Sequence, residues 1–546
     1  MSAAEKDIIQ SAYDDKNIGA EVHEQPVDDL EKNVDAAPVI NRRHLKGRHI
    51  TFIGFGSGIG VGLFVGSGAA LAKAGPLGLF LAFMFTGCIL WSVVQSIGEI
   101  ATLFPVAGSF PHFAARFIDP AAGFALGWNY FYAYSTAVAS ELTAASLIIS
   151  YWSHLSPAVW ITVCFVPMII LNFFPVKYFG EAEVITASIK VITFLGLILL
   201  GIIIDLGGAP NHDRIGFRYW KDPGAMNHFP GIDGSLGRFL AFFSAFINAA
   251  FSYNSTEAVI LTAAECRDPT KQIPKAARRV LYRIMFFYMC GSLIIGMTVP
   301  YTNKKLLAGT GNAASSPFVI AIEASGIKVL PSIFNAAILT SAWSAGNTYI
   351  YVASRTLLGL SLNGQAPRFL QRYTKTGVPW LCVAIPSCFG LLAYLSVGKG
   401  GAAQAFTWLV HLNALSGLLS WGTLCVTFIM YHKAMKSQGV SRKQLSWHAP
   451  LQPYAAWFGA IACGIIVLFS GFAVFLKGRW NTSTFMANYI SIPIYAVPFI
   501  GWKIYKKTRF VKSTEADLYT GRITEDEDVG VEDPPTSWYG KLLDKI

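Results

Sequence analysis

Long apolar stretches recur along the chain from Ile50 to Tyr505, and short polar segments separate them. Each stretch has about 20 residues, which is the length that an α-helix needs to cross the hydrocarbon core of a membrane. We therefore predict an all-α polytopic membrane protein with twelve transmembrane helices. The expected spans are residues 50–72, 77–102, 121–151, 157–174, 183–205, 237–264, 281–300, 328–358, 380–397, 403–431, 455–476 and 485–505.

Polar, acidic segments flank this apolar region on both sides. We expect residues 1–45 to be a disordered cytoplasmic tail, because they contain too few apolar residues to bury a core. Residues 46–506 form the predicted transporter domain, and residues 507–546 form a second acidic tail. The basic residues of segment 42–49 precede the first span, which predicts a cytoplasmic N-terminus. An even number of spans then places the C-terminus in the cytoplasm as well.

The composition supports a membrane protein and argues against a nucleic-acid partner. Of the 546 residues, 53% are hydrophobic and only 14% are charged, whereas about a quarter are charged in a typical soluble domain. The net charge of +11 comes largely from short loops predicted to face the cytoplasm, where membrane topology explains it. The long loop 206–236 is predicted to lie outside and has basic residues accompanied by acidic ones. It weakens the excess of basic residues on the cytoplasmic side without reversing it.

The first apolar span contains a glycine-rich stretch from Gly54 to Phe64 that is poorly suited to a helix. Each glycine inside a helix costs about 1 kcal/mol relative to alanine, so we expect the backbone to unwind here. Unwound backbone is tolerated at membrane depth only where it faces protein or a water-filled cavity. Its free amide groups, at the positive end of the following half-helix, suit a substrate carboxylate.

The sixth span contains a second interruption, Phe251-Ser252-Tyr253-Asn254-Ser255-Thr256-Glu257. It lies five spans after the first interruption. If spans 1–5 and 6–10 are inverted repeats, the first helix of each half is the one expected to be discontinuous, with the substrate between the two breaks. The alternative is that these polar side chains only join neighbouring helices by hydrogen bonds.

Four ionisable residues within predicted spans are candidates for proton transfer or substrate recognition, because charged groups inside a membrane are costly. Lys190 lies seven residues, about 10 Å, into the fifth span and either exchanges a proton or extends its ammonium to the interface. Glu141 in the third span binds a proton or a substrate ammonium, or is hydrogen-bonded to a neighbouring helix. Glu257 is also a candidate helix cap, and His411 is either a proton relay or a core histidine.

The sequence contains no constellation that indicates an enzyme. HExxH, GxSxG and phosphate-binding glycine loops are absent, and the eight cysteines have no metal-ligand spacing. We therefore expect no metal and no cofactor other than a co-transported proton. Asn481-Thr482-Ser483 matches a glycosylation acceptor, on a loop too short to extend far from the membrane.

Several longer blocks carry a family resemblance from about His44 to Lys507. They read "HLKGRHITFIGFGSGIGVGLFVGSG" (44–68), "GEIATLFPVAGSF" (98–110), "DPAAGFALGWNYFYAYSTAVASELTAASLIISYW" (119–152), "FGEAEVITASIKVITFLGLILLG" (179–201), "FSYNSTEAVILTAAECRDPTKQIPKAARRVLYRI" (251–284), "LTSAWSAGNTYIYVASRTLLGLSLNGQAPRF" (339–369) and "TGVPW" (376–380). Together they resemble the fungal amino acid permeases of the amino acid–polyamine–organocation superfamily. The resemblance implies twelve spans, ten of them in a leucine-transporter-like 5+5 inverted repeat, and import of amino acids with protons across the plasma membrane.

The resemblance also assigns roles to individual residues. By position, the substrate carboxylate would be bound by the stretch Gly56, Ser57, Gly58, Ile59 and Gly60. Lys190 matches the fifth-span lysine of the family and Glu141 its third-span glutamate. Three departures lie at the expected site: Gly-Ser-Gly-Ile-Gly-Val-Gly replaces the common Gly-Gly-Thr-Ile-Gly-Thr-Gly, Asn-Ser replaces Gln-Gly in the sixth span, and His411 replaces a common asparagine. They affect the expected specificity rather than the class.

The resulting hypothesis is a proton-coupled amino acid importer. Carbonyl groups between Phe251 and Asn254, including that of Ser252, would bind the substrate ammonium, and Phe251 would act as a gate. Protonation linked to Lys190 or Glu141 would couple the proton to transport. The alternatives are a non-transporting amino acid receptor and a transporter of another nitrogenous solute such as a polyamine. Besides the substrate and membrane lipid, the expected partners are ubiquitin ligases or trafficking adaptors that act on the tails, with candidate ubiquitin acceptors at Lys6, Lys16 and Lys32.

Overall fold

The computed structural model describes residues 54, 58, 60–105, 109–153, 155–264, 269–307, 316–397 and 401–522. These residues belong to one compact unit, His44–Ile546. The part of the chain that the structure describes contains helices and no strand, as the sequence predicts. The predicted tail 1–45 and residues 523–546 lie outside the described residues.

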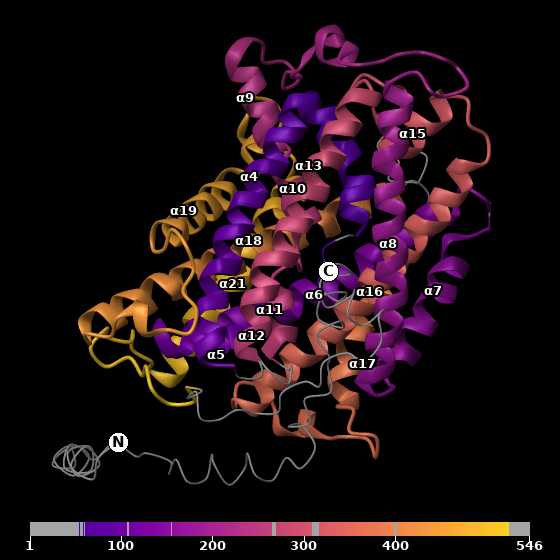
Figure 1. Cartoon of the computed structure of the whole chain (residues 1–546). Coiled ribbons are helices and arrows are strands. Elements are labelled where there is room, and N and C mark those ends of the chain that lie inside the picture. The colour runs from indigo at the N-terminus through magenta and orange to yellow at the C-terminus, as the bar shows by residue number, and fades with distance from the viewer. Residues whose placement is uncertain are drawn as a thin grey trace, which may run out of the picture. The chain divides into compact units, whose positions relative to one another are not determined.

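The helices follow one another along the chain, and the longest connection is the one between α8 and α9 (Figure 1). Their bounds are α4 Ser67–Leu103, α5 Ser109–Phe117, α6 Pro120–Ile149, α7 Pro157–Asn172, α8 Val176–Asp205, α9 Gly234–Ser244, α10 Phe246–Tyr253, α11 Ala258–Ala264, α12 Pro269–Lys275, α13 Leu281–Thr298, α14 Lys304–Leu307, α15 Pro317–Ala324, α16 Leu330–Leu362, α17 Trp380–Phe389, α18 Gly401–Ser437, α19 Tyr454–Phe469, α20 Thr482–Tyr489 and α21 Ser491–Lys506. A π-helical turn, Gly62–Gly66, leads into α4.

Several helices are long and apolar enough to cross a membrane, which agrees with a polytopic membrane protein. Seven qualify among the described residues, or eight if α20 and α21, bent by 50°, form one span. The long helices α6 and α16 are not among the seven. Both are interior helices rich in small and hydroxyl residues, which is typical of helix interfaces in membranes. The count of twelve spans and the inverted repeat stay predictions.

The long helix α4 contains a sharp break at Gly75. The backbone there has φ 74° and ψ 175°, a conformation that favours glycine. The break falls between the predicted spans 50–72 and 77–102. Asn227, from the long loop 206–236, covers it by donating its side-chain amide to the carbonyl of Ala72 at 2.8 Å.

The fifth predicted span begins too late in the sequence analysis. The helix α8 starts at Val176 rather than at residue 183. Lys190 therefore lies fourteen residues, about 21 Å, from the start of its helix. The choice between a proton-exchanging lysine and an interfacial anchor stays a prediction.

Helix α6 packs along both α16 and α18 and forms much of the interior (Figure 1). A small residue allows the close packing on α16, and a polar one joins α6 to α18. Gly127 meets Leu360 of α16, and a Cβ at Gly127 would lie 2.4 Å from the Leu360 side chain. Asn129 donates to the backbone of Ser416 and the hydroxyl of Ser420 on α18, each at 2.8 Å. Polar residues of α6 are thus directed into the protein.

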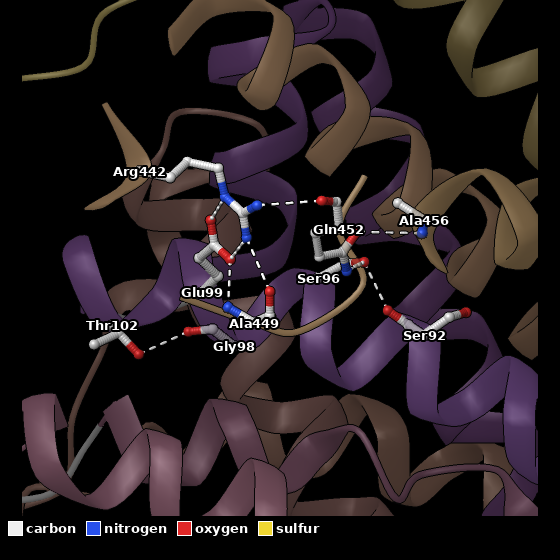
Figure 2. Close-up of polar contacts among 9 residues, drawn as sticks. All are labelled: Ser92, Ser96, Gly98, Glu99, Thr102, Arg442, Ala449, Gln452 and Ala456. Carbon is white, nitrogen blue, oxygen red and sulfur yellow. Dashed lines mark hydrogen bonds and ion pairs between the residues drawn. The ribbon is translucent and has the colours of Figure 1, made fainter. Parts of the chain in front are cut away.

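An ion pair joins the end of α4 to the connection between α18 and α19. Figure 2 shows the Glu99 carboxylate between the Arg442 guanidinium and the backbone of Ala449. Arg442 donates to both carboxylate oxygens at 2.8 and 2.6 Å, and the N–H of Ala449 donates at 2.7 Å. Gln452 extends the network by donating to Ser96 at 2.8 Å. The Glu99 side chain is fully buried, so its charge is satisfied entirely within the protein.

The first residues of the predicted C-terminal tail, 507–522, return to the ends of earlier helices. The N–H of Val511 donates to the carbonyl of Ile118, after α5, at 2.9 Å. Gln438, at the end of α18, donates to the carbonyl of Ala516 at 2.7 Å. This part of the tail therefore packs against the helical body.

Candidate functional site

The predicted interruption of the sixth span is present in the structure. The helix α10 ends at Tyr253, and α11 begins at Ala258 after four residues of turn. Asn254 has φ −58° and ψ 148°, and Ser255 has a left-handed φ of 73°. A serine rarely adopts this backbone conformation, so the surrounding contacts must hold it. The regular helical hydrogen bonding is lost here, inside an apolar run.

The first interruption is described only in part. Gly56, Ser57 and Ile59 lie outside the described residues. Gly58 and Gly60 are both buried, and the backbone at Gly60 is not helical. Among the described residues, Gly54, Gly58 and Val61 are α-helical. The departure from regular helix therefore consists of the bend at Gly60 and the π-helical turn that leads into α4.

The two interruptions lie side by side. A Cβ on Gly62 would lie 2.6 Å from the Cα of Ser252 and 3.1 Å from the ring of Phe251. A Cβ on Gly58 would lie 3.2 Å from the hydroxyl of Thr256. Backbone groups from two segments almost 200 residues apart in sequence therefore converge on one buried location.

Tyr288 on α13 connects the two interruptions, and the sequence analysis did not single it out. Its hydroxyl is within hydrogen-bonding distance of the carbonyls of both Gly58 and Ser252. A hydroxyl has one proton, so it donates to one carbonyl at a time. The ring stacks on Tyr253, with centroids 4.1 Å apart. A tyrosine within an apolar span gives no sequence signal for such a contact.

Glu141 on α6 faces the first interruption, as its predicted role requires. The side chain is buried, and one carboxylate oxygen lies 3.5 Å from the position that a Cβ of Gly60 would occupy. The N–H of Val61 donates to this carboxylate. The other oxygen has no hydrogen-bond partner among the described residues. Glu141 thus presents a free acceptor close to the break.

Lys190 interacts electrostatically with two carboxylates. One belongs to Glu141, and the other belongs to Glu183, seven residues earlier on α8. The three side chains are each only 1% exposed. The structure therefore brings the two predicted proton-coupling residues together and adds an acid that the sequence analysis missed.

Glu257 and Asn254 are both held to other helices. The hydroxyls of Tyr130 and Tyr134, one turn apart on α6, donate to one Glu257 oxygen at 3.3 and 3.2 Å. The side-chain amide of Asn254 donates to the side chain of Asn413 on α18. For Asn254 the structure favours the alternative in which polar groups join helices. The other Glu257 oxygen has no hydrogen-bond partner among the described residues, and the choice between a helix cap and a functional role stays a prediction.

Phe251 and His411 occupy different surroundings. Phe251 is buried between Gly62 and Phe406, whose ring lies edge-on at 6.4 Å. His411 contacts the side-chain oxygen of Asn488 on α20 at 3.0 Å. His411 is partly buried, and its two predicted roles, core histidine and proton relay, stay predictions.

Two interrupted helices in contact, with buried ionisable groups beside them, define a membrane transporter more readily than an enzyme. Comparison with known proteins agrees with this class. The family model described as "Amino acid permease" matches residues 49–515, and the chain belongs to this family. The family consists of permeases and is not an enzyme family.

Curated relatives match most of the chain. The dicarboxylic amino acid permease of Saccharomyces cerevisiae is 41% identical over 486 residues, which cover 88% of this chain and 80% of the relative. The proline-specific permease of the same yeast is 40% identical over 541 residues, which cover 95% of this chain and 86% of the relative. The lysine-specific permease of this yeast is 40% identical over 525 residues, which cover 95% of this chain and 85% of the relative. These relatives support a function in amino acid transport.

Proposed function

We propose that this chain is a proton-coupled importer of α-amino acids in the plasma membrane. The observation that carries the proposal is the contact between Gly62 and Ser252, because it joins two sets of freed backbone groups in one buried place. The relatives are named for amino acids with acidic, cyclic and basic side chains. The α-carboxylate and the amino nitrogen are the groups that these amino acids share, so the proposed site recognises them.

In this proposal twelve helices cross the membrane, ten of them in a 5+5 inverted repeat with two helices added, and both termini are cytoplasmic. The interruption before α4 and the interruption between α10 and α11 support the repeat, because each would lie in the first helix of its half. The transporter domain is residues 46–506, flanked by two acidic tails.

The substrate carboxylate is bound by backbone amides of Gly56–Gly60. The ammonium group is bound by the free oxygen of Glu141 and by carbonyls between Phe251 and Asn254. Ser252 contributes its carbonyl when the Tyr288 hydroxyl donates to Gly58 instead. Phe251 closes over the occupied site.

A proton enters with the substrate, and the cluster around Lys190 and Glu141 couples the two. One proton crossing 100 mV supplies about 2.3 kcal/mol. Each unit of pH difference adds about 1.36 kcal/mol. Together these terms allow accumulation on the order of several hundred-fold. No metal or other cofactor is proposed, and the tails, with Lys6, Lys16 and Lys32, are proposed contacts for ubiquitin ligases or trafficking adaptors.

The test is accumulation of labelled amino acids by the purified protein in liposomes, with and without an inward proton gradient. We expect accumulation that collapses when a protonophore is added. Lys190→Ala should abolish gradient-driven accumulation while equilibrium binding of the substrate persists. Normal proton-dependent accumulation by Lys190→Ala would remove this lysine from the coupling scheme.

Two other outcomes would replace the proposal. Binding of an amino acid by the folded protein without any flux would indicate a receptor. Competition by carboxylate-free amines, with no competition by amino acids, would indicate a polyamine or another nitrogenous solute.

A further inference from the structure

The cluster around Lys190 has an unbalanced formal charge. It contains one ammonium and two carboxylates, those of Glu141 and Glu183, all buried. With every group ionised the cluster has a net charge of −1 in the protein interior. An uncompensated buried charge is costly, and a single added proton would neutralise the cluster. The cluster is therefore suited to hold one proton, and its two carboxylates are the places where that proton can reside.

The surroundings of the two carboxylates differ in a way that decides between them. Glu141 receives a backbone N–H from Val61. An N–H can only donate, so it favours the ionised carboxylate. Glu183 contacts the Ser344 hydroxyl, which lies 2.8 and 2.9 Å from its two oxygens, and the hydroxyls of Thr186 and Thr348 also lie beside this carboxylate. A hydroxyl can donate to an ionised carboxylate or accept from a protonated one, so Ser344 serves both forms of Glu183 without a change in position.

Lys190 is the charged group that acts most strongly on Glu183. The neighbours of Glu183 on other helices are mostly uncharged. Ser344 lies on α16, the helix packed most extensively on α8, and Thr186 donates to the Ser344 hydroxyl at 3.1 Å. The helices that pack on α8 have few charged residues. These are Arg355 on α16, Arg283 on α13 and Glu323 on α15, and Glu323 pairs with Lys305. Helix α7 has no charged residue.

We propose that Glu183 holds the proton that is transported with the substrate, with Ser344 as its hydrogen-bonding partner in both protonation states. The proposal rests on the proposed proton-coupled transport. When Glu183 is ionised, it shares the Lys190 ammonium with Glu141. When a proton from the outer solution forms an O–H bond on Glu183, the Lys190 ammonium pairs with Glu141 alone. Glu141 is the carboxylate that faces the first interruption. Release of that proton to the inner solution restores the shared arrangement.

The test uses Glu183→Gln in liposomes, because glutamine keeps the shape of a permanently neutral carboxyl group. We expect substrate binding and the exchange of internal for external amino acid to continue. Proton-driven accumulation should fall at least tenfold, and proton influx per imported amino acid should fall from about one to near zero. The matched control is Glu181→Gln, two residues away on the same helix, which should accumulate substrate like the wild type.

Three results would overturn the assignment. Accumulation by Glu183→Gln at the wild-type level would show that the proton is held elsewhere. Equal loss of exchange and accumulation would show that Glu183 has a structural role. If Glu183→Gln does not fold, Ser344→Ala decides. The Ser344 hydroxyl bonds the ionised carboxylate more strongly than the protonated one, so its loss should move the pH midpoint of uptake upward by about one unit, and an unchanged midpoint contradicts the proposal. Absence of proton-linked uptake by the wild type would instead refute the proposed function itself.

Discussion

Gly62 and Ser252 approach each other so closely that a methyl group on the glycine would lie 2.6 Å from the Cα of the serine. Real Cβ atoms do not come that near to a backbone carbon. The contact joins the π-helical turn before α4 to the last turn of α10, and both segments end beside an interruption. The distance between the two interruptions is therefore set by a residue that has no side chain.

Gly62→Ala should separate the two interruptions. The added methyl group meets backbone, which cannot rotate away, so we expect overpacking to cost about 1–3 kcal/mol of stability. Substrate uptake should fall at least tenfold. Gly66→Ala is the matched control from the same turn, because its added Cβ would find only the Ser252 hydroxyl, at 3.9 Å. Uptake assays and thermal unfolding of both variants check this prediction, which fails if the two variants behave alike.

Tyr288→Phe should weaken substrate binding. The change removes the hydroxyl shared by the carbonyls of Gly58 and Ser252 and leaves them without that donor. A buried group that loses its partner costs about 1–3 kcal/mol, so we expect about a tenfold or greater rise in the substrate concentration for half-maximal uptake. Tyr253→Phe is the control, because the Tyr253 hydroxyl has no hydrogen-bond partner among the described residues. Equal effects of the two changes would count against the role of Tyr288.

Arg442→Ala should destabilise the junction of α4 with the connection between α18 and α19. The hydrogen bonds to Glu99 raise the pKa of Arg442, so the guanidinium stays charged throughout the physiological range. Its removal leaves the fully buried Glu99 carboxylate without a counter-ion, a change that typically costs about 3–5 kcal/mol. Thermal unfolding in detergent measures the loss. Lys443→Ala, at the exposed neighbouring residue, should have little effect, and a similar loss in both variants would contradict this account.

The attachment of the segment after α21 should depend on pH through Asp517. Burial alone would raise the pKa of this carboxyl, but the N–H groups of Thr520 and Tyr519 and the nearby Arg116 hold it below the ordinary value. A lowered pKa in the folded state means that the ionised group stabilises the attachment above the ordinary aspartate pKa of about 4. This stabilisation is lost as the pH falls through the lower folded value.

Hydrogen exchange of the backbone amides of residues 511–520, corrected for the intrinsic effect of pH, measures this attachment. We expect exchange to accelerate below about pH 4. Asp517→Asn cannot ionise, so its protection should be lower at neutral pH and should change little on acidification. A pH-dependent loss of protection that persists in Asp517→Asn would assign the effect to another group.

The interruption between α10 and α11 could be predicted from sequence because its cause is local. The polar residues after Phe251 are poor helix formers within an apolar run, whatever surrounds them. Of the glycine-rich stretch, the described residues show a bend at Gly60 and a π-helical turn, and the full predicted break stays a prediction. What the sequence could not provide is the set of contacts between distant segments. The hydroxyl of Tyr288 and the link from Asn254 to Asn413 depend on how helices pack, and neither has a local signal.

Glu183 was missed for a different physical reason. The apolar span was predicted to start at residue 183, so this acid appeared to lie at the membrane boundary. The helix in fact begins at Val176 and extends through polar residues that apolarity alone cannot assign. Glu183 is buried because α16 covers it with Ser344, which is a property of the tertiary structure.

The return of the chain after Lys506 has a mechanical consequence. Val511 is hydrogen-bonded to the end of α5, and Ala516 to the end of α18, so one short segment joins two helices that lie more than 300 residues apart in sequence. If α5 and α18 move apart at these ends, at least one of these two bonds must break. The segment therefore couples the separation of these two helix ends to the loss of its own hydrogen bonds.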